Sequence, residues 1–105
     1  MILNDDLFEL YAVMCKTISK PTRLKILHYI GTGKANVSDM HKALNVSMSS
    51  LSNHLNDLYR AGVLTREKQG NFVYYSLSEP GLLEVIDNMQ NIIKKMSSRL
   101  AVTQS

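Results

Sequence analysis

The chain has 105 residues, 45% of them hydrophobic, with 12 Lys and Arg against 9 Asp and Glu. This length predicts a single domain over residues 1–105, and a net charge of +3 is too small to indicate a partner by itself. The lone cysteine, Cys15, excludes an intramolecular disulfide, and no apolar run is long enough to span a membrane. We therefore expect a cytoplasmic protein without a membrane partner. Cys15 lies next to Met14 on a predicted packed helix, so we expect a buried, inert thiol, with a Cys15–Cys15 pair between subunits as the alternative.

The first half of the chain is predicted to be helical. Apolar residues recur at helical spacing over residues 5–18, and Pro21 begins a second helix that ends at Gly31. Asn36 and Ser47 can cap two further helices, over residues 37–44 and 48–61, joined by a short connection. Two short helices joined in this way predict a helix-turn-helix at residues 36–61.

After Gly62 the repeat of apolar residues changes from the 3.6 residues of a helix to the 2 residues of a strand. Residues 63–68 and 72–77 read as two strands joined by a tight turn, which together form a hairpin at 63–77. Tyr74 and Tyr75 face opposite ways, so one of them is expected in the core. A last helix is predicted over residues 79–100, and its apolar residues alternate at spacings of four and three. The expected fold class is mainly α with a small β-hairpin, in the order α-α-α-α-β-β-α.

This order of elements is that of a winged helix-turn-helix, and several segments resemble the ArsR/SmtB-type transcriptional repressors. Residues 20–27 (KPTRLKIL) are similar to the second helix of that family, and residues 47–58 (SMSSLSNHLNDL) to its recognition helix. Residues 60–64 and 73–77 match as well. The resemblance implies a dimeric repressor that binds double-stranded DNA at a palindromic operator.

Recognition helices place their N-terminal residues at the base edges of the major groove. The fourth helix carries no Lys or Arg between Met48 and Tyr59, so basic side chains elsewhere must neutralise phosphates. Residues 16–34 hold five Lys and Arg and no acid, of which we expect one or two lysines to face DNA. The serines could instead serve as caps, and His54 could equally bond another helix. The candidate DNA contacts are Ser47, Ser49, Ser50, Asn53 and His54, with Arg66, Lys68, Gln69 and Asn71 in the wing.

The first and last helices, residues 1–18 and 79–100, carry apolar stripes broader than a small domain needs. A long apolar seam would stay exposed unless it met another helix, so a homodimer is expected. The candidate interface residues are Leu7, Leu10, Tyr11, Met14, Ile86, Met89, Ile93 and Met96.

Metal sensing is not expected. Members of the family that sense metals carry Cys-Val-Cys in the third helix, where this chain has Asn36, Val37 and Ser38. A second family site pairs Asp-x-His with a later His-x-x-Glu. Asp87 remains at that site, but Met89, Leu100 and Thr103 stand at its other positions. We therefore predict neither a metal nor another cofactor.

Two other classes of function are weighed against a DNA-binding regulator. Because the recognition helix lacks positive charge, the winged helix could be a protein-interaction or antirepressor module that binds another regulator. An enzyme is not expected, since no nucleophile, base and orienting group recur in a motif and no phosphate-binding loop is present.

Overall fold

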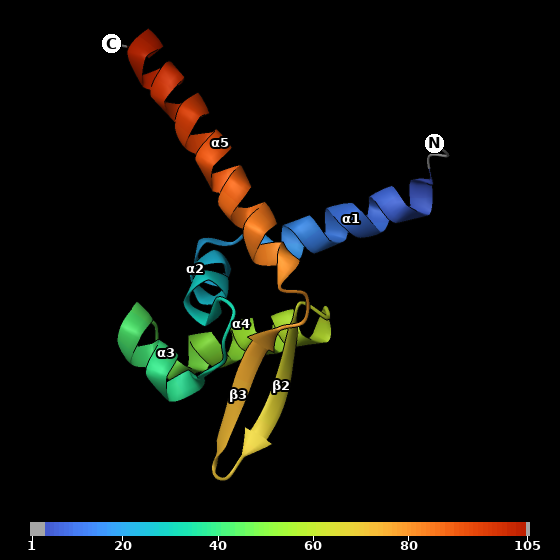
Figure 1. The fold of residues 1–105 in the computed structure, drawn as a ribbon, viewed down its shortest axis with the longest axis vertical. Coiled ribbons are helices and arrows are strands. Elements are labelled where there is room, and N and C mark those ends of the chain that lie inside the picture. The colour runs from blue at the N-terminus through green and yellow to red at the C-terminus, as the bar shows by residue number, and fades with distance from the viewer. Residues whose placement is uncertain (1–3, 105) are drawn as a thin grey trace.

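The computed structural model describes residues 4–104, with side chains described for residues 4–100. It is a winged helix-turn-helix, mainly helical, with a three-stranded antiparallel sheet (Figure 1). The elements in chain order are α1 (Asp5–Ile18), α2 (Pro21–Ile30), β1 (Ala35–Asn36), α3 (Val37–Leu44), α4 (Met48–Arg60), β2 (Leu64–Gln69), β3 (Phe72–Leu77) and α5 (Gly81–Gln104). All five helices and both wing strands were predicted, with ends within four residues of those observed.

Local sequence explains where the helices begin and end. Asn4 caps α1, because its side-chain oxygen accepts from the backbone N–H of Asp6 at 3.0 Å. Pro21 occupies the first turn of α2, where a missing N–H costs nothing. Gly31 ends α2 with a φ of 57°, a left-handed conformation that glycine adopts without strain.

The sheet contains a strand that the predicted order of elements lacks. β1 pairs antiparallel with β3, with Ala35 opposite Tyr75 and Asn36 opposite Tyr74, so the strand order is β1-β3-β2. β1 has only two residues, and Asn36 also caps α3 by accepting from the N–H of Asp39 at 2.8 Å. The predicted hairpin is confirmed as β2 and β3, and β1 adds a third strand that the prediction lacked.

The core lies between α2, α3, α4 and the base of the sheet. Tyr75 points into it and is 8% exposed, whereas Tyr74 stays half-buried, as alternate positions on a strand require. The largest fully buried side chains of the core are Ile26, Leu27, Met40, Leu51, Leu55, Leu58 and Leu64. This core holds α4 against the rest of the domain while leaving its outer face open.

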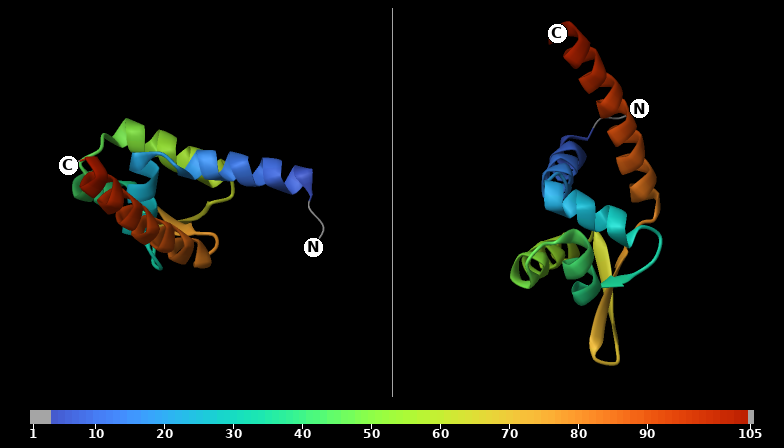
Figure 2. Two further views of the ribbon diagram at one scale, coloured as in Figure 1. Left: turned by 90° about the horizontal axis from the view of Figure 1, so that it is seen from above. Right: turned by 90° about the vertical axis from the view of Figure 1, so that its left-hand side faces the viewer.

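α1 and α5 diverge from each other on the side away from the wing tip (Figure 1 and Figure 2). Among the described side chains of α1 and α5, those that pack against the core lie at the C-terminal end of α1 and in the first turns of α5: Met14, Ile18, Leu82, Leu83 and Ile86. The prediction that Cys15 is buried was wrong: its side chain is exposed, because the core covers α1 only beside it. No helix in the described part of the chain is long and apolar enough to cross a membrane.

Candidate DNA-binding interface

The turn between α3 and α4 is held by two features of its backbone. Asn45 adopts the left-handed conformation at a φ of 55°, which Asn tolerates better than most residues. Nδ1 of His41 donates to the carbonyl oxygen of Val46 at 2.6 Å across this turn. The turn fixes the direction in which α4 leaves α3.

The N-terminal half of α4 presents small polar side chains to solvent. The hydroxyl of Ser47 caps the helix by accepting from the N–H of Ser50 at 3.2 Å, and it lies 3.4 Å from the hydroxyl of Ser49. Ser49 and Asn53 are exposed on the side opposite Leu51 and Leu55, whereas Ser50 is half-buried. Ser49 and Asn53 are thus free to contact a partner, while Ser47 already serves as the cap.

His54 turns away from that exposed side and toward α2. Its Nδ1 accepts from Nε of Arg23 at 3.1 Å. This is the bond to another helix that was the alternative to a DNA contact. Arg23 is only 5% exposed, and it also donates through Nη1 to the carbonyl of Thr17 at 2.8 Å and through Nη2 to Asp57. One buried guanidinium therefore joins the end of α1, the start of α2 and the middle of α4.

The same environment lowers the pKa of His54 below its ordinary value of 6.5. Burial contributes most, because it disfavours the charged imidazolium, and the positive charges of Arg23 and Lys20 add to the effect against the opposing carboxylate of Asp57. A neutral imidazole can accept at Nδ1, which the bond from Arg23 requires.

The wing places cations beside α4. The guanidinium of Arg66 on β2 lies over the ring of Tyr59 at 3.9 Å from its centroid, a cation–π contact that orients the side chain at the end of α4. Lys34 donates to the side-chain oxygen of Gln69 at 2.9 Å and lies 4.9 Å from the ring centroid of Tyr74. Lys34 thereby ties the segment before β1 to the wing.

The tip of the wing is a tight turn at Gly70, whose φ is 63°. Lys68, Gln69 and Asn71 are exposed around it. The predicted wing residues thus lie on one hairpin, separate from the predicted residues of α4.

Sequence reasoning missed two residues that organise this surface. Tyr59 was not proposed, although an aromatic side chain just before the wing can be a platform for a wing cation. Arg23 was counted only as one of the five basic residues of the segment 16–34, yet it is buried. The sequence signal for this burial was the spacing of His54 and Asp57, which lie on one later helix where a single guanidinium can reach both.

Comparison with known proteins agrees with this geometry. The family model described as "Bacterial regulatory protein, arsR family" matches residues 20–66. The chain is 41% identical over 80 residues to the transcriptional repressor SdpR of Bacillus subtilis, covering 76% of this chain and 89% of SdpR. The chain belongs to the ArsR family. It is a winged-helix DNA-binding transcriptional repressor, and this family consists of regulators rather than enzymes.

Solved structures place this ArsR-family protein among similar folds. Rv0081 of Mycobacterium tuberculosis superposes with a TM-score of 0.81 at 27% identity, covering 90% of this chain and 96% of Rv0081. The winged helix-turn-helix domain of Mb0332 from Mycobacterium bovis, described as homodimeric, gives a TM-score of 0.79 at 19% identity over 90% of this chain and 88% of that one. The second comparison concerns the fold alone.

Proposed function

We propose that this ArsR-family repressor is a homodimer that reads a palindromic operator through α4 and the wing and uses no metal at the family's usual positions. One domain would carry both tasks, with residues 36–61 and 63–77 on DNA and residues 1–18 and 79–100 between subunits. The observation that carries the proposal is the exposed, neutral face of α4 beside a wing that carries cations.

Base reading is assigned to the first two turns of α4. Ser49 and Asn53 are exposed there, and an Asn side chain can make paired hydrogen bonds to adenine in the major groove. Ser47, Ser50 and His54 would act mainly by fixing the helix, since each already takes part in the cap or the bond to Arg23. Arg66, Lys68, Gln69 and Asn71 would contact the backbone or the minor groove.

A titration of the full chain against its own upstream region tests this assignment. We expect saturable binding that weakens as salt is added, because phosphate contacts release counterions. Asn53→Ala should reduce discrimination between the operator and a scrambled fragment, by about 1–3 kcal/mol for a paired base contact. Arg66→Ala and Lys68→Ala should weaken both fragments alike and lower the salt dependence. Asn91→Ala, on α5, is the matched control.

The dimer is proposed from apolar surface that the protomer leaves open. α5 spans 24 residues, about 36 Å, and beyond Ile86 its described side chains are all exposed. On α1 the exposed apolar residues Leu7, Phe8, Leu10, Tyr11 and Val13 are 54–63% exposed. On α5 they are Val85, Met89, Ile92, Ile93, Met96 and Leu100, at 51–60%. Surfaces of this kind mark association sites, and a second copy matches both stripes.

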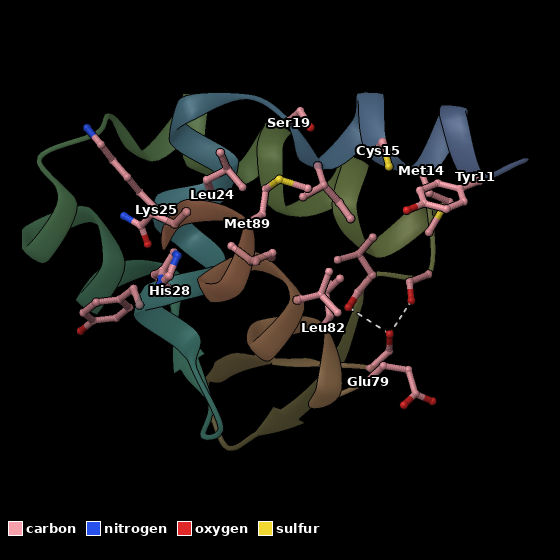
Figure 3. A pocket seen from close by; sticks show the side chains of 18 of the residues that line it. Tyr11, Met14, Cys15, Ser19, Leu24, Lys25, His28, Glu79, Leu82 and Met89 are labelled. Atoms are coloured by element: carbon pink, nitrogen blue, oxygen red, sulfur yellow. Dashed lines mark hydrogen bonds between the residues drawn. The ribbon is translucent and has the colours of Figure 1, made fainter. Parts of the chain in front are cut away.

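A cleft between α1, α2 and α5 continues these stripes into the domain (Figure 3). Its volume is about 1200 Å³, and Met14, Leu24 and Met89 lie around it from the three helices. In the proposed dimer the apolar face of a partner helix fills this cleft. The candidate interface residues Met14 and Ile86 lie at its inner wall, where they also pack on the core.

The proposed lack of metal sensing rests on side-chain chemistry. Asn36 is 7% exposed and caps α3, and neither Val37 nor Ser38 offers a thiolate. Asp87 lies 3.4 Å from Nδ1 of His28, and within the described residues no third His, Cys, Asp or Glu joins them in a cluster. Addition of zinc or cadmium should leave the operator Kd unchanged. A tenfold loss of affinity that a chelator reverses would contradict this proposal.

The rival function, a module that binds another regulator in place of DNA, is favoured by the absence of Lys and Arg over residues 48–59. It predicts that no upstream fragment is bound at low salt and that a protein partner copurifies in fixed ratio. The titration above therefore separates the two functions.

A further inference from the structure

A basic groove lies on the domain between three helices, on the side of α4 away from the wing. It has a volume of about 460 Å³ and is lined by the C-terminal end of α1, the start of α2 and the C-terminal end of α4. α1 packs beside α4 there, as both views of Figure 2 show. The groove lies apart from the wing, at the C-terminal end of α4 beyond the exposed Ser49 and Asn53.

Three cations line the groove and have no carboxylate partner. Lys16, Lys20 and Arg60 are exposed, and no ion pair or side-chain hydrogen bond engages them within the described residues. The acid in the lining, Asp57, is already bonded to Nη2 of the buried Arg23. The groove therefore carries an uncompensated positive charge, which attracts an anion.

The position of Arg60 relates the groove to the recognition face. Arg60 follows Asn53 by seven residues, which on an α-helix is two turns, on the same face, and about 10.5 Å along the axis. The major groove of DNA is about 12 Å wide. When Asn53 lies at the base edges, Arg60 lies two turns further along the axis of α4, toward a phosphate strand that borders the major groove of the DNA.

The opposite side of α4 already has its own cations. There Arg66 lies over Tyr59, and Lys34 is tied to Gln69 of the wing. A recognition helix without Lys or Arg from Met48 to Tyr59 is thereby flanked by basic side chains on both sides. The wing supplies the basic side chains on one side of α4, and the basic groove supplies those on the other side.

From this placement we propose that the groove formed by Lys16, Lys20 and Arg60 holds a backbone phosphate of the operator, in addition to the base contacts of Ser49 and Asn53 and the contacts of the wing. The inference rests on the proposed DNA-binding function and adds a contact to it. Its chemistry is charge neutralisation without base recognition, so it raises affinity equally for all sequences.

The test uses the full chain and the DNA fragment that the wild-type protein binds. We expect the triple variant Lys16→Ala, Lys20→Ala, Arg60→Ala to lower the slope of log Kd against log salt by about 2 for a dimer, about one phosphate per subunit. Its Kd should rise by the same factor for the operator and a scrambled fragment. Lys95→Ala, an exposed lysine off the apolar seam of α5, should leave the slope unchanged.

A second measurement locates the phosphate. Replacing single phosphates of the DNA with uncharged methylphosphonate should weaken wild-type binding at one position in each half-site. At that position the same replacement should not weaken binding of the triple variant any further. The double variant Lys16→Arg, Lys20→Arg keeps all three positive charges and should retain the wild-type salt slope, which separates the effect of charge from that of changing the side chains.

Three outcomes would overturn the proposal. An unchanged salt slope in a folded triple variant removes the groove from the DNA contacts, while wild-type binding keeps the proposed function intact. A rise in the wild-type Tm with inorganic phosphate, lost in the triple variant while its salt slope stays normal, identifies a site for a free anion instead. Absence of wild-type binding to any fragment overturns the proposed function and this inference together.

Discussion

Nε of Arg23 donates to Nδ1 of His54 at 3.1 Å, and this bond joins the start of α2 to the middle of the recognition helix. Arg23 is 5% exposed and reaches Thr17 and Asp57 as well. The residue that anchors α4 is therefore a buried cation inside the domain. The direction in which the exposed Ser49 and Asn53 face solvent depends on this anchor.

The stability of the protein should depend on the protonation of His54. Its pKa is lowered below 6.5 in the folded state, first by burial and then by Arg23 and Lys20. Above pH 6.5 the imidazole is neutral in both states, and its contribution to stability is fully present. As the pH falls below 6.5 the unfolded chain takes up the proton first, so this contribution is lost down to the folded pKa.

His54→Asn tests this dependence, because an Asn oxygen can accept from Arg23 and does not titrate. The difference in unfolding free energy between wild type and variant should shrink as the pH falls from 7 to 5. This difference should change with pH by well under the limit of about 1.4 kcal/mol per pH unit that applies to one proton, because His54 is partly exposed and solvent screens its charge. Parallel stability curves from urea denaturation would falsify the assignment.

Arg23→Met should destabilise the domain by about 2–4 kcal/mol. The change removes three hydrogen bonds and leaves the carbonyl of Thr17 and Nδ1 of His54 without their donor, whereas Asp57, 51% exposed, can turn to water. Arg23→Lys should recover only part of the loss, since an ammonium cannot reach three acceptors as a planar guanidinium does. Urea denaturation at fixed protein concentration measures both, with the exposed Lys42→Met on α3 as control. A loss no larger than that of Lys42→Met would contradict the anchoring role.

The turn of the helix-turn-helix makes a separate prediction. Asn45 has a φ of 55°, so Asn45→Ala should cost about 1 kcal/mol of stability, and Asn45→Gly should cost nothing or stabilise slightly. Thermal unfolding of the two variants beside wild type measures the difference. Equal Tm values for the Ala and Gly variants would mean that the backbone at Asn45 carries no such cost.

Local pattern was enough to predict the helices and the wing. The caps at Asn36 and Ser47, the apolar spacing through Leu51, Leu55 and Leu58, and the turn at Gly70 act within a few residues, so they can be read without knowing the fold. β1 could not be found in this way. Ala35 and Asn36 pair with residues about 40 positions later, and two residues show no strand period.

The site shows the same division. The exposed face of α4 follows from helical spacing, so Ser49 and Asn53 were placed correctly on the surface. Arg23 looked like one more charge in a basic segment, because its burial depends on His54 and Asp57, 31 and 34 residues further on. Cys15 was misplaced for a related reason, since helical spacing tells which residues share a face but not how far the core covers it.

Ile93→Glu should convert the protein from dimer to monomer. Ile93 is 53% exposed in the protomer, in the middle of the apolar seam of α5, and a dimer would bury the new carboxylate of each subunit beside apolar side chains without a cation to pair it. Asn91→Glu adds the same charge on the opposite face of the helix and should leave the dimer intact. Sedimentation equilibrium measures the change, and operator titration of the same samples should show weaker binding for Ile93→Glu alone, because a monomer meets one half-site at a time. If both variants sediment as dimers, the seam of α5 does not form the interface. If Ile93→Glu is a monomer with undiminished operator affinity, the two half-sites are not read together.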